Sequence, residues 1–371
     1  MTLRIDVTAT DGPARTGTVT TARGSFRTPC FMPVGTRGAV RTLSSADLEE
    51  LGVELALANT YHLMLRPGVD VVARLGGLHR FMAWDRHALT DSGGYQVFSL
   101  SPSVDDDGVT FRSTYDGTTH RLTPEDAVAV QEQLGADIQM VLDVCPPLPS
   151  PPEVVRAAVE RTAAWAARAC RVHRREGQAL FGIVQGGVDP TLRAESAERT
   201  VDIGFDGYGI GGLSVGESRP EMLDALDACI GHLPADHPRY LMGVGDPVGL
   251  AEAVARGVDL FDCVLPTRLA RHGTVLTSTG RLSLRNAACR DDARPLDPSC
   301  PCPVCARWSR AYLRHLQMVG EPAAARLVTI HNVSWILGLV DRLRTAVTAG
   351  RLATLRAELA EVWCQDEKGP R

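Results

Sequence analysis

Three aspartates stand at the ends of short apolar runs in this sequence. Asp91 closes the run that starts at His87, Asp143 follows Ile138, and Asp262 lies beside Phe261. An unpaired carboxylate in an apolar run costs several kcal/mol, so such positions are hard to explain by packing alone. If the runs are parallel strands, the carboxylates converge, which predicts acid–base or nucleophilic chemistry on a polar, neutral or cationic group. A simple Asp-Ser-Gly turn is the alternative for Asp91.

A second group of residues has metal-ligand spacing. Cys300, Cys302 and Cys305 fall within six residues, and His331 follows. Three thiolates and one imidazole are the ligands that tetrahedral Zn²⁺ prefers, and four protein ligands leave no open position, which predicts a structural zinc ion. Unrelated buried thiols and an iron–sulfur cluster are the alternatives; the single histidine disfavours the cluster. The other cysteines are scattered, which predicts free thiols: Cys30, Cys145, Cys170, Cys229, Cys263, Cys289 and Cys364.

Glycine-rich turns supply neutral polar groups. Gln185 precedes two glycines, and the segment 211–217 reads GGLSVGE. Amide and backbone groups beside a carboxylate can recognise the edge of a purine. The segment 91–96, DSGGYQ, lets the backbone approach a flat ligand and places an aromatic ring nearby. The segment 207–212 also matches G-x-G-x-x-G, but its glycines lie in an expected strand, so a dinucleotide site is rejected.

The elements that position these residues repeat along the chain. Eight apolar runs predict strands at Cys30–Val34, Val53–Asn59, His87–Asp91, Asp137–Asp143, Ala179–Gln185, Gly207–Gly212, Tyr240–Val244 and Val258–Cys263. Amphipathic stretches predict helices at Pro124–Leu134, Pro152–Arg175, Leu192–Ile203, Arg219–Ile230 and Pro247–Arg256. Eight β/α units predict a closed α/β barrel of the (β/α)8 type, with the active site at the carboxyl ends of its strands.

Two stretches do not fit this repeat. Ser99–Leu122 alternates polar and apolar residues around Asp-Gly turns, which predicts an inserted β-hairpin. Leu265–Gly320 contains the clustered cysteines, and Glu321–Trp363 returns to a helical pattern. The expected organisation is therefore a barrel over residues 1–264 with an insertion near 99–122, a zinc-binding subdomain over 265–331, and a C-terminal helical segment over 332–371 that completes the barrel.

Composition and charge narrow the class of protein. The chain has 371 residues, 44% of them hydrophobic and 22% charged, which is typical of a globular protein. No apolar run approaches the length of a membrane span, and the N-terminus does not resemble a secretion signal, so a cytoplasmic protein is expected. The net charge of −5 disfavours a polyanionic partner. However, residues 263–320 carry nine arginines and three aspartates, a local charge of +6 that leaves −11 on the other residues. This basic lobe favours a polyanionic partner, and a solvated arginine-rich face is the alternative.

The chain resembles the bacterial tRNA-guanine transglycosylases, the queuine tRNA-ribosyltransferase family, in motifs that cover nearly its whole length. They include TPCFMPVGTRGAVRTL, ANTYHLMLRPG, LTDSGGYQVFSL, LGADIQMVLDVC, FGIVQGG, GIGGLSVGE, YLMGVG, GVDLFDCVLPTRLARHG, LDPSCPCPVC and LVTIHN. The resemblance implies a (β/α)8 barrel with a zinc subdomain. It also implies exchange of guanine at wobble position 34 of tRNAs with a GUN anticodon for 7-aminomethyl-7-deazaguanine, a queuosine precursor, by double displacement and without a nucleotide cofactor.

The resemblance further implies roles for individual residues. Asp262 matches the nucleophile and Asp91 the general acid/base. The positions that match the base pocket are Ser92, Gly93, Gly94, Tyr95, Asp143, Cys145, Gln185, Gly212, Leu213 and Met242, with Tyr95 and Met242 as the stacking pair. Those that match RNA-contacting loops are Gly243, Val244, Gly245, Asp246, Pro247, Val248, Gly249, Thr267, Arg268, Leu269, Ala270 and Arg271. A homodimer is implied by Trp308, Tyr312 and His315, on one face of an expected helix, together with Phe81. Packing of this aromatic face in the core is the alternative.

One departure from the family pattern leaves the incoming base open. Val144 replaces the usual acidic residue after Asp143, whereas Cys145, Val215 and Glu217 fit the bacterial pocket. Queuine as the incoming base is therefore one alternative. A non-catalytic tRNA-binding subunit is another, disfavoured by the presence of both Asp91 and Asp262, and a zinc hydrolase is a third, disfavoured by the complete zinc ligand set.

Overall fold

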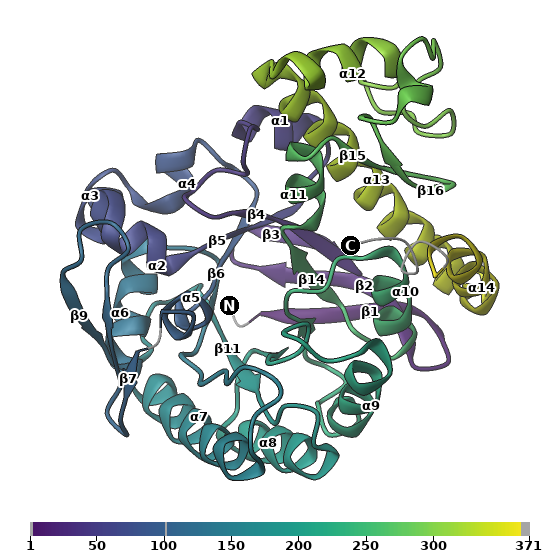
Figure 1. Ribbon diagram of the computed structural model, residues 1–371. Helices are drawn as coiled ribbons and strands as arrows, with labels where there is room; N and C mark the ends of the chain where they lie inside the picture. The colour runs from purple at the N-terminus through teal and green to yellow at the C-terminus, as the bar shows by residue number, and fades with distance from the viewer. Residues whose placement is uncertain (1–2, 101, 365–371) are drawn as a thin grey trace.

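The core of the molecule is a closed barrel of eight parallel strands. A computed structural model describes residues 3–100 and 102–364. The parts of the expected segments 1–264, 99–122 and 332–371 that fall on residues 1–2, 101 and 365–371 lie outside the described residues. Around the barrel the strands follow the order β4 (Cys30–Gly35), β5 (Leu55–Ala58), β6 (His87–Thr90), β10 (Ile138–Met140), β11 (Ala179–Val184), β12 (Gly207–Ile210), β13 (Arg239–Leu241) and β14 (Leu260–Cys263) (Figure 1). The predicted fold class and all eight predicted strands are confirmed.

Helices surround the barrel because strands such as β11 and β12 are buried on both faces and need an apolar cover. Capping boxes at Thr123 and Ser218 start two of these helices at the predicted residues. The helix expected to reach Arg175 ends at Val172. The helices up to the last barrel strand are α1 (Ser45–Glu50), α2 (Thr60–Leu63), η1 (Met64–Gly68), α3 (Val69–Arg74), α4 (Gly77–Met82), α5 (Gly94–Phe98), α6 (Pro124–Leu134), α7 (Pro152–Val172), α8 (Pro190–Ile203), α9 (Arg219–Ile230) and α10 (Pro247–Ala255).

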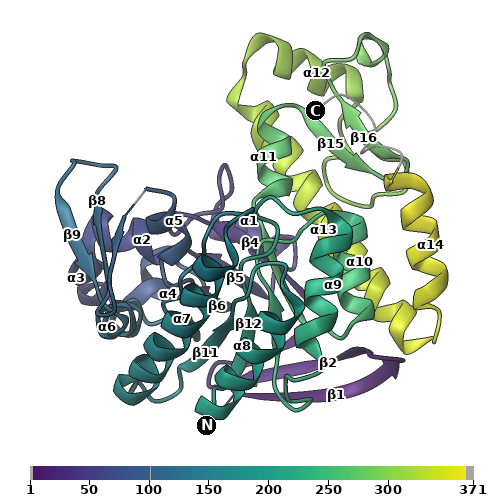
Figure 2. The ribbon, with the colours of Figure 1, turned by 60° about the horizontal axis from the view of Figure 1, so that its bottom comes forward.

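An antiparallel sheet that the sequence analysis does not anticipate precedes the barrel. It contains β1 (Arg4–Asp11), β2 (Ala14–Thr21) and β3 (Gly24–Thr28). Arg15 of β2 forms a buried ion pair with Asp259 at 2.6 Å, directly before β14 begins. The sheet therefore lies at the amino end of the barrel, the bottom in Figure 2, away from the expected active-site end.

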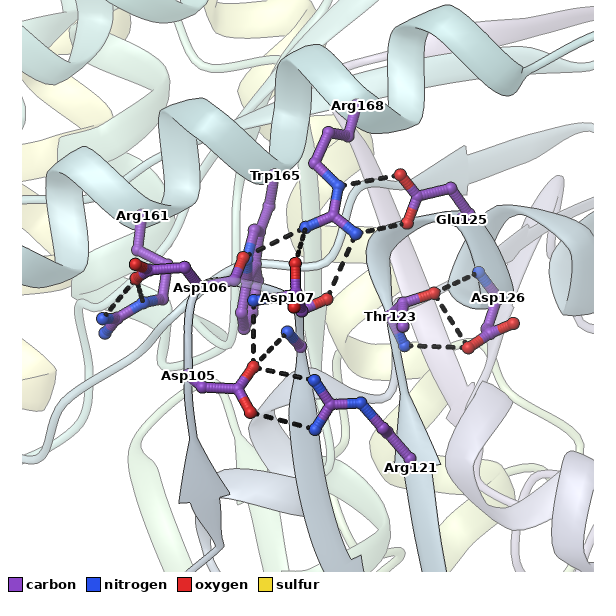
Figure 3. A network of polar contacts seen from close by, with 11 residues as sticks. Asp105, Asp106, Asp107, Arg121, Thr123, Glu125, Asp126, Arg161, Trp165 and Arg168 are labelled. Carbon is purple, nitrogen blue, oxygen red and sulfur yellow. Dashed lines mark hydrogen bonds and ion pairs between the residues drawn. The ribbon is translucent and has the colours of Figure 1, made fainter.

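The insertion after β6 is a three-stranded sheet where a single hairpin is expected. It contains β7 (Ser103–Val104), β8 (Val109–Arg112) and β9 (Thr119–Leu122). Its acidic first turn is held by helix α7: Trp165 and Arg168 donate to the Asp106 carbonyl at 2.8 and 3.0 Å, and Arg161 pairs with the Asp106 carboxylate at 2.9 Å (Figure 3). Bonds from two side chains to one carbonyl fix the position of the sheet against the barrel.

The C-terminal part forms a separate lobe beside the active-site end and then returns to the barrel. The lobe contains α11 (Leu265–Arg271), β15 (Thr274–Thr277), β16 (Gly280–Ser283), η2 (Ala287–Cys289) and α12 (Arg310–Val319) (Figure 2). Helix α13 (Pro322–Thr348) contacts α11, β4 and the first two strands, and α14 (Leu352–Trp363) packs on α10. The expected boundary between residues 331 and 332 falls inside α13, so one continuous helix joins the lobe to the barrel.

Helix α13 is also the one described helix whose length and composition would suit a membrane span. Of the residues in its most apolar stretch, 67% are buried inside the protein. Its apolar face contacts both the barrel core and the core of the lobe, through side chains such as Val328, Val333 and Ile336. The apolar pattern is thus accounted for by packing inside the protein.

Candidate active site and metal centre

Asp262 is the penultimate residue of the last barrel strand, β14, and has one occupied and one free carboxylate oxygen. The Tyr240 hydroxyl and the Gly243 amide both donate to its Oδ1, at 2.6 and 2.8 Å. Among residues 3–100 and 102–364, no donor bonds to Oδ2. Burial raises the pKa of the Asp262 carboxyl, and the two hydrogen bonds act in the opposite direction. The bonds hold the carboxylate in one orientation while leaving Oδ2 open to a reacting atom.

Asp91, at the end of β6, has both carboxylate oxygens occupied. The Thr60 and Gly93 amides donate to Oδ1 at 2.8 and 3.2 Å, whereas Gln96 donates to Oδ2 at 3.1 Å and Asn59 donates to the same atom. Burial raises the pKa of the Asp91 carboxyl, and these donors lower it. A carboxylate with four donors is oriented rather than free, so the two aspartates are not equivalent.

The third carboxylate, Asp143, is paired with an amide. The Gln185 Nε2 donates to Asp143 Oδ2 at 2.6 Å. Burial raises the pKa of the Asp143 carboxyl to about 6, and the nearby charge of Asp91 adds to the increase. A side chain at Gly94 would place its Cβ 3.2 Å from Asp143 Oδ1, so the turn that follows Asp91 lies directly against Asp143. The structure therefore brings Asp91, Asp143 and Gln185 together as expected from strand ends.

We expect the burial of Asp143 to destabilise the folded protein at neutral and alkaline pH. Because the pKa rises from 3.8 to about 6 on folding, the stabilisation from protonation is complete below pH 3.8 and is lost as the pH rises through 6. Asp143→Asn keeps an oxygen for Gln185 and removes the charge. Its free energy of unfolding should exceed that of the wild type by on the order of 2 kcal/mol at pH 8. Urea melts at pH 8 and pH 4 measure the difference; a gap of equal size at both pH values would contradict this explanation.

A buried arginine, which the sequence analysis misses, organises the glycine-rich turns. Arg193 on α8 is fully buried, and its guanidinium donates to the carbonyls of Gly187, Gly211 and Gly212 at 2.7, 2.7 and 3.1 Å. At Gly212, which has a positive φ of 65°, a Cβ would lie 2.2 Å from Gln185 Oε1. Only glycine fits there. Local sequence carries no signal for Arg193, because its partners lie on two different loops.

The remaining expected base-pocket positions differ in accessibility. Tyr95 on α5 is 61% exposed, and Met242 after β13 is partly exposed with its sulfur close to Gly209 and Gly211. Ser92 and Leu213 are buried. Burial raises the pKa of the half-buried Cys145 thiol to about 12, so this pocket wall is neutral. Asn59, Gln96 and Tyr240 also bond to the two main carboxylates, and no local sequence pattern assigns these bonds to them.

Only part of the expected RNA-contacting positions lies at the surface. In 243–249, Gly243 is exposed and Asp246 partly exposed, whereas the other five residues are buried, with 247–249 in the first turn of α10. In 267–271, Arg268 is exposed and Arg271 partly exposed, while Thr267 and Ala270 face the core. Among these positions, Gly243, Asp246, Arg268, Leu269 and Arg271 are thus accessible to a ligand.

The three cysteines and the histidine of the expected metal site converge. Their ligand atoms all lie within 4.8 Å of one another, with His331 Nδ1 at 3.4 and 3.3 Å from the Cys302 and Cys305 sulfurs. Nε2 of His331 bonds the Leu276 carbonyl at 2.8 Å, which leaves Nδ1 for a metal. Tetrahedral zinc has Zn–S near 2.3 Å and Zn–N near 2.0 Å. Sulfur and nitrogen ligands at such distances from one metal lie about 3.5 Å apart, so the residues fit one such ion.

The expected aromatic face of the lobe is not a single helix face. Helix α12 begins at Arg310 after an N-cap at Ser309, so Trp308 lies before the helix and the prediction that it is helical is wrong. Tyr312 is 45% exposed, His315 is exposed, and Phe81 on α4 is exposed. Trp308 is partly buried against the core of the lobe. Tyr312 and His315 are therefore surface residues, which excludes a core role for them.

Comparisons with known proteins show which sequences this chain resembles. The sequence model of the family described as "Queuine tRNA-ribosyltransferase" matches residues 10–365. A protein named queuine tRNA-ribosyltransferase from Moorella thermoacetica is 54% identical over 350 residues, 94% of each chain. Proteins of the same name from Solidesulfovibrio magneticus and Sphingopyxis alaskensis are 50% and 51% identical, over 96% and 95% of this chain and 97% and 96% of their own.

Proposed function

The chain belongs to the queuine tRNA-ribosyltransferase family, and from this we propose that it is a cytoplasmic tRNA-guanine transglycosylase. In this proposal it exchanges guanine at wobble position 34 of GUN-anticodon tRNAs for 7-aminomethyl-7-deazaguanine. The difference between the two aspartates carries the assignment of their roles. Oδ2 of Asp262 accepts no hydrogen bond from the described residues, whereas both carboxylate oxygens of Asp91 accept hydrogen bonds.

The first half-reaction follows from the free oxygen. Asp262 Oδ2 attacks C1′ of the ribose while the C1′–N9 bond to guanine breaks, and the bonding electrons leave with the base. The base takes up the proton of the Asp91 carboxyl, which leaves Asp91 as a carboxylate for the next step. Tyr240 and Gly243 hold the other oxygen, so the attacking lone pair is already aimed. The product is a covalent ribosyl ester, as in retaining glycoside transfer.

The second half-reaction restores the original configuration. The ring nitrogen of the incoming base attacks C1′, the C1′–O bond to Asp262 breaks, and the proton from that nitrogen goes to Asp91. A carboxyl whose pKa is raised by burial is a better proton acceptor than an exposed aspartate. Two inversions at C1′ give net retention.

The purine edge meets the groups gathered at β10, β11 and β12. The hydrogen-bond donors and acceptors come from Asp143, Gln185 and the backbone at Gly212 and Leu213. The faces of the purine stack between Tyr95 and Met242. The Glu217 carboxylate accepts from the amides of Ser214 and Val215, the latter at 3.0 Å. Because a trans peptide points its C=O away from its N–H, the Leu213 carbonyl points away from Glu217. A carbonyl in that orientation suits a cationic aminomethyl group, which supports the aminomethyl base over the neutral cyano precursor.

The metal in this proposal is one structural Zn²⁺ per chain, held by Cys300, Cys302, Cys305 and His331. When bound, the ion would link the segments that carry its ligands. Four protein ligands complete a tetrahedral shell and leave no position for a water molecule to be activated. His331 lies on α13 and the cysteines lie in the loop before α12. The ion thus connects the lobe that carries Arg268 and Arg271 to the helix that packs on the barrel.

Base exchange in purified tRNA(Tyr) tests the function. We expect labelled guanine to enter the tRNA, and the aminomethyl base to displace it more efficiently than the cyano precursor or queuine. A preference for queuine would select the alternative incoming base. Binding of tRNA without any exchange would overturn the enzymatic role and leave the tRNA-binding subunit.

The proposal includes a homodimer through Trp308, Tyr312, His315 and Phe81. We expect Tyr312→Ala to weaken the dimer, because the truncation removes most of the surface that this aromatic side chain, 45% exposed in the monomer, can bury against the partner. Mass photometry over a dilution series measures the dissociation constant of the dimer, which should rise by about tenfold or more in this variant. Val154→Ala, an exposed apolar residue on α7, is the control. Identical dilution curves for both variants and the wild type would refute this interface.

A further inference from the structure

The strand order divides the mouth of the barrel into two arcs. Strands β10 to β12 carry the purine-edge groups, Asp143, Gln185 and Gly212. On the opposite arc β14, β4, β5 and β6 are neighbours, so the carboxyl ends of β4 and β5 lie between Asp262 and Asp91. The loops after β4 and β5 thus border the reaction site from the side away from the base pocket.

An arginine–tyrosine cluster stands on this second arc. The guanidinium carbons of Arg37, after β4, and Arg66, after β5, lie 5.4 and 4.7 Å from the ring centre of Tyr115. The Tyr115 hydroxyl is 2.9 Å from His62 Nδ1. Both arginines are exposed and Tyr115 is half-buried. Each guanidinium is within the roughly 6 Å at which a cation is attracted to an aromatic ring.

The cluster concentrates positive charge that the protein does not neutralise. In residues 3–100 and 102–364, neither Arg37 nor Arg66 has a carboxylate within ion-pair distance, whereas neighbouring Arg74 pairs with Asp70. Two like charges beside one ring repel each other, and the ring face offsets only part of that cost. A ligand with negative charge and several acceptor oxygens would remove the repulsion and satisfy both guanidinium forks.

The position of the ring is fixed by the fold. The Tyr61 hydroxyl on α2 accepts from the Thr114 amide at 3.2 Å and lies 3.1 Å from the Thr114 hydroxyl, next to Tyr115. At its other end the insertion sheet is held by α7 through the Asp106 carbonyl (Figure 3). The ring of Tyr115 is therefore held in place before binding, which lowers the entropic cost of ordering the two arginines against it.

We propose that Arg37, Arg66 and Tyr115 form a tRNA-backbone site that binds phosphates of the anticodon arm beside the extruded nucleotide. This inference rests on the proposed function and deepens it. Arg41, which lies close enough to Arg271 for their charges to interact, continues the positive arc from the cluster to α11 and Arg268. The backbone thus follows the basic arc while the base enters the pocket on the other one, and in Figure 2 the insertion sheet and the C-terminal lobe rise on either side of that path.

Salt-dependent tRNA binding tests this site. The variant is Arg37→Ala combined with Arg66→Ala, and the control is Arg351→Ala, an exposed arginine before α14 on the side of the β1 sheet. We expect the double variant to bind tRNA(Tyr) about tenfold or more weakly at low salt, and its slope of log K against log salt to be smaller by about 1 to 2. The control should match the wild type. Equal affinity and equal slope in the double variant and the control would overturn the proposal.

Exchange kinetics separate this proposal from the function on which it rests. In the double variant the KM for tRNA should rise by about tenfold, with the KM for guanine unchanged. Tyr115→Ala should also raise the KM for tRNA, but by less than the double variant. If the wild type exchanges guanine but the double variant keeps its tRNA KM, the cluster has no role. If the wild type exchanges nothing, the proposed function fails, and the binding slopes still decide whether the cluster contacts RNA.

Discussion

Replacing Asp262 with asparagine is expected to abolish guanine exchange into tRNA. Asparagine keeps an oxygen for Tyr240 and Gly243 but puts an amide nitrogen in place of the free Oδ2, so the fold is retained while the nucleophile is lost. Loss of a covalent nucleophile lowers turnover by on the order of 10⁴-fold or more. Asp262→Ala should be equally inactive. Incorporation of labelled guanine measures the rate, and a denaturing gel tests for the covalent tRNA adduct.

Binding measurements complete this experiment. Both variants should bind tRNA within a few-fold of the wild type, because the basic arc and the lobe do not depend on the Asp262 carboxylate. Tyr240→Phe provides a graded control: it removes one of two donors to Oδ1 and should slow exchange by about 10- to 100-fold while the adduct still forms. An adduct that persists in Asp262→Asn would assign the nucleophile to another residue.

Removing the metal is expected to unfold the C-terminal lobe rather than to stop the chemistry alone. Apparent binding energies of structural zinc are on the order of 10 kcal/mol in small domains, and that energy is part of their folding energy. Cys302→Ala should therefore lower the melting temperature by about 10 °C or more. Hydrogen exchange should accelerate mainly in residues 265–331, with the barrel strands protected.

Cys289→Ala is the matched control for this loss. Cys289 is a buried cysteine of the same lobe whose sulfur bonds the Ser283 carbonyl and lies outside the ligand cluster. Its replacement should cost only about 1 kcal/mol of packing. A chelator should reproduce the effect of Cys302→Ala on the wild type and have little further effect on that variant. Melting curves that are the same with and without chelator would exclude a structural metal.

Much of the fold follows from local pattern. Each barrel strand is a buried apolar run between turn residues, and the helices between them begin at caps such as Thr123 and Ser218. The N-terminal sheet is not predicted, because the threonine-rich strand β2 lacks a clear apolar face and is held by long-range contacts such as Arg15 with Asp259. The end of the expected aromatic helix at Trp308 is likewise decided by a cap at Ser309.

The sequence by itself determined the (β/α)8 barrel, the carboxylates at its strand ends, the metal ligands and the separation of charge between an acidic barrel and a basic lobe. These depend on periodicity, turn chemistry and spacing within short windows. Only the tertiary structure decided which oxygen of Asp262 is free, that Arg193 orders the pocket loops, and that Arg37 and Arg66 share the ring of Tyr115. The physical reason is that hydrogen bonds and ring contacts between separate loops depend on how the closed barrel brings its strand ends together, and no local window of sequence contains both partners.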